Sequence, residues 1–137
     1  MRTFVPRIAA LIVGGLALTA CSTMRYEFQQ AAAGEPEARI PFVQYRTIRD
    51  WHADNDRQLF LQTTGRQWYQ VDLVGPCIGL EYANGIRLDP KDPAGSFDRF
   101  SVVILKGQRC QVASVKKAPP PLRVEKARAT RPQANQA

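Results

Sequence analysis

The residues between 41 and 115 contain no stretch of 12 in which apolar side chains follow a helical period. Short apolar runs alternate there with Gly, Pro, Asn and Asp, the residues that favour turns. This pattern excludes a helical bundle and predicts a sheet of short strands. The strands are expected at residues 47–51, 57–63, 67–74, 78–83, 100–105 and 109–115.

The clearest of these strands is the one at residues 67–74. Tyr69 and Val71 alternate with Gln70 and Asp72, which is the period of two that a strand with one buried face requires. By contrast, residues 100–105 are apolar on both faces, which is typical of a strand covered on both sides. The chain therefore supplies strands for both the edges and the interior of a sheet.

Two hairpins are expected, one around a turn at 64–66 and one around a turn at 106–108. Gly65 and Gly107 hold equivalent places in them, each eight residues after an arginine. This echo allows a duplicated hairpin or two generic hairpins, and the generic reading is favoured because turn glycines recur in all antiparallel sheets. We predict an all-β domain, a small antiparallel meander of about six strands curled into a barrel or sandwich.

The first 20 residues have the pattern of a signal peptide. Arg2 and Arg7 precede an uncharged stretch of 13 residues, which is too short to span a bilayer. The stretch ends in Leu18-Thr19-Ala20-Cys21, which resembles the bacterial lipobox, although a secretory signal followed by a chance cysteine is the alternative. The lipobox resemblance implies cleavage before Cys21 and attachment of acyl chains to its thiol, so that the protein is anchored without spanning the membrane.

The residue after the expected lipidated cysteine is Ser22. In Gram-negative lipoproteins an Asp at this place retains the protein at the inner membrane, so Ser22 implies the outer membrane, with the domain facing the periplasm. Residues 21–40 then form a flexible linker without apolar periodicity, and residues 41–115 form the domain.

The formal net charge of the 137-residue chain, +7, is concentrated at its ends. Residues 116–137 hold six basic side chains against one acidic, whereas the rest of the mature chain is neutral. Nucleic-acid binding is therefore excluded, because the basicity is outside the domain and the envelope holds no nucleic acid. This Pro-rich tail is expected to be disordered and to contact the anionic cell wall or lipid phosphates.

With Cys21 acylated, Cys77 and Cys110 remain as an even pair in an oxidising compartment. A disulfide is the expected state. The alternatives are a redox pair or a metal site, but the chain has no CxxC motif, and two thiols with one distant His do not complete a zinc set. Closing a loop of 33 residues stabilises the fold by roughly 3.5–4 kcal/mol, comparable to the net stability of so small a domain.

Several motifs within residues 41–115 resemble domain-of-unknown-function family 6491. The most specific is Gly75-Pro76-Cys77-Ile78-Gly79-Leu80, which is followed by Arg109-Cys110-Gln111-Val112. Trp51, the run from Gln67 to Leu73 and Phe97-Asp98-Arg99-Phe100 occur in the same order. The resemblance supports the paired cysteines and the domain boundaries, and it implies no activity, ligand or catalytic residue.

Catalytic and metal sites find little support. His52 is the only histidine, and no serine lies near it in a nucleophile context, so a solvent-exposed histidine at a strand end is favoured over a general base. Residues 54–56 and the pair Asp89 and Asp92 offer oxygens to calcium, but neither has the glycine and distal glutamate of an EF-hand loop. Turn formation accounts for both, and no metal or cofactor is expected.

The aromatic residues are expected to fill the core, with one exception. Trp68 is on the same side of its strand as Gln70 and Asp72, next to Arg66. An exposed tryptophan among polar groups is typical of a binding patch, so Trp68, Arg66 and Gln70 form a candidate patch unless a closed sandwich covers that face.

Three classes of function remain. A non-catalytic interaction or accessory lipoprotein is favoured. A small-ligand-binding or hydrolase-inhibitor module is the alternative, with residues 88–95 as the candidate inhibitory loop. An enzyme is disfavoured, because the sequence shows no catalytic constellation.

Overall fold

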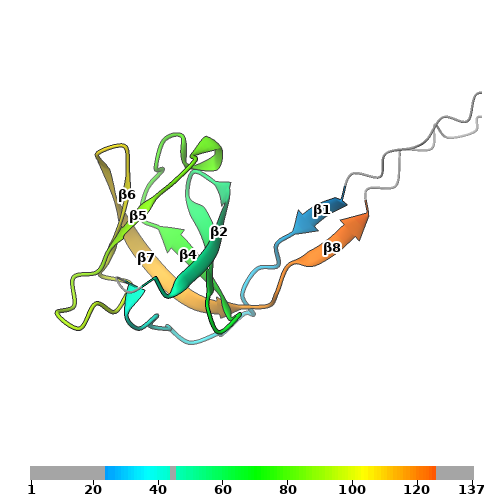
Figure 1. Ribbon diagram of the computed structural model, residues 1–137, viewed down its shortest axis with the longest axis horizontal. Coiled ribbons are helices and arrows are strands. Elements are labelled where there is room, and N and C mark those ends of the chain that lie inside the picture. The colour runs from blue at the N-terminus through cyan, green and yellow to red at the C-terminus, as the bar shows by residue number, and fades with distance from the viewer. Residues whose placement is uncertain (1–23, 44–45, 126–137) are drawn as a thin grey trace, which may run out of the picture.

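The computed structural model describes residues 24–43 and 46–125, and its main body is one curled antiparallel sheet (Figure 1). The strand order in this six-stranded sheet is β2-β3-β4-β7-β6-β5. The strands are β2 (Ile48–Asn55), β3 (Gln58–Thr63), β4 (Trp68–Leu73), β5 (Arg87–Asp89), β6 (Val102–Leu105) and β7 (Gln108–Ala118). Two three-stranded meanders thus meet where β4 pairs with β7, and the curl leaves β2 and β5 as the two edges of a half-barrel. The prediction of an all-β fold is confirmed.

Both expected hairpins form. The β6–β7 turn consists of Lys106 and Gly107 between the paired residues Leu105 and Gln108. Lys106 has φ 48° and Gly107 has φ 82°, which is the conformation of a two-residue type I′ turn. Glycine is favoured at the second position because a side chain there strains the backbone. The same two-residue geometry fixes the register that turns Val103 and Leu105 toward the core.

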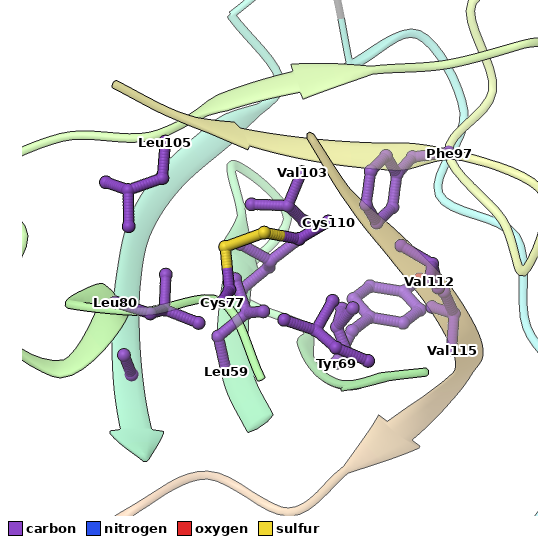
Figure 2. Packing of buried hydrophobic residues seen from close by; sticks show 14 of the residues in the cluster. Leu59, Tyr69, Cys77, Leu80, Phe97, Val103, Leu105, Cys110, Val112 and Val115 are labelled. Carbon is purple, nitrogen blue, oxygen red and sulfur yellow. A yellow bond between two sulfur atoms is a disulfide. The ribbon is translucent and has the colours of Figure 1, made fainter. Parts of the chain in front are cut away.

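The core fills the concave side of the sheet around the disulfide between Cys77 and Cys110 (Figure 2). The prediction of this bridge is confirmed, and both cysteines are buried. Side chains from both meanders surround it, among them Leu59, Tyr69, Val103, Leu105, Val112 and Val115. Alternate residues of β3 and β4 face inward, as the period of two predicts.

The prediction of a strand at residues 78–83 is wrong. A three-residue 3-10 helix, η2 (Leu80–Tyr82), lies there instead. Only Leu80 points into the core, whereas Ile78 is 66% exposed and Tyr82 is 83% exposed. The disulfide and the hydrogen bond from Cys77 N to Asp56 O hold the chain against the core, so it turns rather than extends. The sixth strand is β5, a three-residue strand that the sequence analysis placed in a loop.

Residues 28–43 contact the domain at several points, although a flexible linker was expected up to residue 40. The backbone N of Ala38 donates to Val115 O at 2.7 Å, and Ile40 exchanges two backbone hydrogen bonds with Phe97. Ile40 is completely buried. The difference arises because Ile40 and Phe28 bury apolar side chains on the domain, which a solvated linker cannot do.

The two ends of the described chain form a ribbon that projects from the half-barrel (Figure 1). Strand β1 (Met24–Glu27) pairs antiparallel with β8 (Leu122–Glu125), with Met24 opposite Glu125. The domain also extends past its expected boundary at residue 115, because β7 continues to Ala118 and pairs with β4 from Val112 to Ala118. Cys21 and residues 126–137 lie outside the described residues.

Candidate ligand-binding groove

A groove of about 660 Å³ lies between the two edges of the half-barrel. Ile48 and Trp51 line it from β2, and Arg87, Leu88 and Asp89 line it from β5. Its remaining lining residues are Val43, Arg46, Leu61, Ile86, Pro90, Ile104 and Arg109. The volume is in the range of small-molecule sites, roughly 300–1,000 Å³. The curl of the sheet therefore creates a concave surface where its edges do not meet.

The groove has an apolar floor and a basic rim. Leu61 and Ile104 are buried beneath it, and the Trp51 ring packs against the core while remaining partly exposed. Arg46, Arg87 and Arg109 are exposed around it, and Asp89 is the one acidic lining residue. The groove thus combines hydrophobic surface with an excess of positive charge.

The carboxylate of Asp89 is already paired. Its Oδ2 accepts hydrogen bonds from Lys91 Nζ at 2.7 Å and from Arg109 Nη2 at 2.8 Å. The Lys91 hydrogen bond first, and the Arg109 hydrogen bond second, lower the pKa of Asp89. Asp89 therefore stays ionised at neutral pH, and the two cations that it contacts outnumber it.

A second hollow, of about 710 Å³, lies where the ribbon meets the sheet. Its wall includes the rings of Tyr26, Phe28, Trp51, His52 and Trp68, together with Pro120 and Pro121. Its charged lining residues, Arg25 and Asp50, balance each other. This hollow offers aromatic surface without an excess of either charge.

The patch expected at Trp68, Arg66 and Gln70 is not an exposed surface. Trp68 is only 7% exposed, because the Phe28 ring meets it edge-on with the centroids 5.1 Å apart. Gln70 is equally buried; its Oε1 accepts a hydrogen bond from Ala31 N and its Nε2 donates to Asp72. Arg66 alone is exposed, at the β3–β4 turn. The face is covered by the chain's own N-terminal segment rather than by a second sheet.

The other candidates serve structural roles in the described part of the chain. His52 lies within β2, and its ring stacks on Phe28 at 4.2 Å between centroids. Asn55 Oδ1 accepts from Arg57 N, and Asp92 Oδ1 accepts from Ala94 N, the side-chain-to-backbone bonds of turns. Residues 24–43 and 46–125 hold no cluster of three or more His, Cys, Asp or Glu side chains suited to a metal ion. Nor do they contain a helix with the length and hydrophobicity that a bilayer crossing requires.

Residues 2–137 match the model of a family of unknown function, DUF6491. The chain belongs to the DUF6491 family. The match extends well beyond the resemblance seen in residues 41–115 and includes the segment that covers Trp68 and both strands of the ribbon. No curated protein and no solved structure matches this DUF6491 chain.

Sequence patterns did not reveal the groove of this DUF6491 protein. Nor did they reveal the strap, residues 28–31, which lies over Trp68 and Gln70. The arginines of the groove come from three separate places, Arg46 before β2, Arg87 in β5 and Arg109 in β7. No local spacing joins them, since only the curl of the sheet brings them to one opening. Phe28 likewise left no local signal, because the residues that it contacts, Phe60 and Trp68, lie far along the chain.

Proposed function

We propose that this protein is a non-catalytic binding module, attached to the outer membrane through acyl chains on Cys21 and facing the periplasm. The single observation that carries the anchoring is the ribbon. β1 begins at Met24, three residues after Cys21, and the β1–β8 ribbon projects from the domain (Figure 1). The signal pattern of residues 1–20 supports export and acylation, and Ser22 supports sorting to the outer membrane.

The ribbon suits the role of a spacer. Four residues at about 3.3 Å each separate the domain from its anchor by roughly 13 Å. Two paired strands are stiffer than a single chain, so the groove is held clear of the lipid headgroups. A domain that binds a ligand in the periplasm needs such access.

Binding rather than catalysis is favoured by the composition of the groove. Its described lining residues include no Ser, Thr, Cys or His that would serve as nucleophile or general base. The one carboxylate of the groove, Asp89, already accepts hydrogen bonds from Lys91 and Arg109. The other lining side chains are apolar or arginine, and they bind and orient a ligand without providing a proton-transfer group. The groove thus favours the small-ligand-binding form of the proposal.

The hydrolase-inhibitor alternative has less support. An inhibitory loop must project, but much of the segment at residues 88–95 is held against its neighbours. Pro90 and Gly95 are buried, and Gly95 O accepts a hydrogen bond from Val43 N. Leu88 and Asp89 belong to β5.

The basic tail is proposed to contact lipid phosphates or the anionic cell wall. Met24 and Glu125 are paired at the end of the ribbon. The tail therefore starts next to the residue that lies three positions after Cys21. Lys126, Arg128 and Arg131 follow within a few residues. If Cys21 is in the membrane, these cations begin beside its anionic surface, where each contributes roughly 1 kcal/mol.

Fractionation of a Gram-negative host tests the anchoring. The wild-type chain should be found in the outer membrane, and globomycin should cause its uncleaved form to accumulate. Cys21→Ala should abolish incorporation of labelled palmitate. Ser22→Asp is the matched variant, because it should keep the label and move the protein to the inner membrane. Processing that globomycin does not affect, with no acyl label, would contradict the proposal.

A further inference from the structure

We propose that the groove between β2 and β5 binds a single-chain amphipathic anion, with its phosphate or carboxylate at the arginines and its alkyl chain on the apolar floor. This inference rests on the proposed binding role and specifies its ligand. It is carried by the combination of charge and hydrophobic surface in one opening.

The charges of the groove select an anion. Arg46 and Arg87 have no carboxylate within 4.0 Å among the described residues, since the ion pairs of this part of the chain involve Arg39, Lys91 and Arg109. Arg109 shares Asp89 with Lys91. Within the described part of the chain, no carboxylate therefore occupies these two guanidinium groups, and guanidinium matches the geometry of phosphate and carboxylate oxygens.

The floor selects an alkyl chain. Three partly exposed residues, Ile48, Trp51 and Ile86, present hydrophobic surface beneath the arginines. Two buried residues, Leu61 and Ile104, lie under that surface. All of these residues pack on the main core or belong to it, apart from Ile104, which is buried in β6. A hydrated anion alone would leave this surface in water, whereas an alkyl chain would cover it. Each buried methylene strengthens binding several-fold, so affinity should rise with chain length until the floor is covered.

The second hollow does not fit this ligand, although Trp51 lines both. Its charged residues, Arg25 and Asp50, cancel, and its walls are aromatic. The two tryptophans separate the sites, because Trp68 lines only the second hollow and is buried under Phe28. A ligand in the groove between β2 and β5 should perturb the indole of Trp51 and leave that of Trp68 unchanged.

The test uses the chain from residue 21 to 137 with Cys21→Ser, which keeps every described residue and removes the acyl chains. Decyl phosphate, decanoate, decyltrimethylammonium and inorganic phosphate are titrated below their critical micelle concentrations. The indole N–H resonances of Trp51 and Trp68 are followed by NMR. Decyl phosphate and decanoate should shift the Trp51 resonance, and octyl phosphate should bind about tenfold more weakly than decyl phosphate. Inorganic phosphate and the cationic amphiphile should bind at least tenfold more weakly than decyl phosphate.

Substitutions assign the headgroup contact. Arg87→Ala should weaken decyl phosphate binding about tenfold, the usual effect of losing one charge-assisted hydrogen bond. Arg99→Ala is the matched control, because Arg99 is exposed outside the groove, over the Phe100 ring. Melting temperatures of both variants equal to that of the chain without these substitutions would exclude a folding defect.

Three results would overturn the inference, namely equal binding of the cationic amphiphile, an equal effect of Arg87→Ala and Arg99→Ala, and a shift of Trp68 instead of Trp51. Binding of decyl chains regardless of headgroup would preserve the proposed binding role and reject its anionic ligand. Outer-membrane anchoring is read out by fractionation, so its failure is distinguishable from failure of the ligand.

Discussion

The rings of Phe28 and His52 lie stacked, with centroids 4.2 Å apart and planes inclined by 5°. Phe28 also contacts Phe60 and Trp68, which form a second small core on the convex side of the sheet with Ala118. One aromatic residue of the N-terminal segment therefore covers a face that the alternation of β4 marks as polar.

Phe28→Ala should destabilise the domain and expose Trp68. Removing a partly buried phenyl ring costs about 2 kcal/mol, less than the roughly 3–5 kcal/mol of a fully buried one. The melting temperature should fall, and the tryptophan emission should move to longer wavelength. Phe100→Ala is the control, because Phe100 is 63% exposed and lies outside the hollow that Trp51 and Trp68 line. Unchanged emission in Phe28→Ala would show that this ring does not shield Trp68.

Cys77→Ser and Cys110→Ser should lower stability equally. Each removes the same bridge, whose loop of 33 residues contributes roughly 3.5–4 kcal/mol by loop-closure entropy. The double variant should cost little more than either single one, because the two substitutions are fully coupled. Chemical denaturation measures the three values, and two free thiols in the native wild-type protein would contradict the account.

Truncation separates the tail from the domain. A chain ending at residue 125 should keep the melting temperature of the full chain, whereas one ending at residue 115 should be less stable. The shorter chain loses the part of β7 that pairs with Trp68, Tyr69 and Gln70, and it loses the buried Ala118. Loss of residues 126–137, which hold Lys126, Arg128 and Arg131, should weaken salt-sensitive binding to anionic vesicles in both truncated chains. Equal vesicle binding by the full chain and the chain ending at residue 125 would show that residues 126–137 do not contribute to this binding.

The pKa of Asp89 should lie below its ordinary value, because Lys91 and Arg109 both donate hydrogen bonds to its carboxylate. The pKa of Asp89 is lower in the folded than in the unfolded state. The pairing therefore stabilises the fold at a pH above the unfolded-state pKa, and this stabilisation is lost as the pH falls through the folded-state pKa. Lys91→Ala and Arg109→Ala should each raise the pKa, which NMR of the side-chain carboxyl carbon measures. Lys106→Ala, at the β6–β7 turn, should leave it unchanged. An unchanged pKa of Asp89 in both Lys91→Ala and Arg109→Ala would contradict the pairing.

Short apolar runs and the turn residues beside them were enough to predict β3, β4, β6 and β7 and the turns of the two hairpins. The same pattern failed at residues 78–83, where Ile78, Leu80 and Tyr82 alternate like a strand but the disulfide at Cys77 forces a turn. The strap at Phe28 and the ribbon depend on contacts between residues far apart in the chain, which local pattern does not reveal. The groove depends on the curl of the sheet, so its arginines became neighbours only in the folded structure.

The most direct test of the central claim, a binding module anchored by lipid at Cys21, is the mass of the protein extracted from the envelope. We predict that the protein recovered from the outer membrane is a mature chain that begins at Cys21 and carries a diacylglyceryl group on its thiol. The N-terminal peptide released by protease should carry all of the added mass. A chain that begins at any other residue, or an unmodified Cys21, would contradict the account.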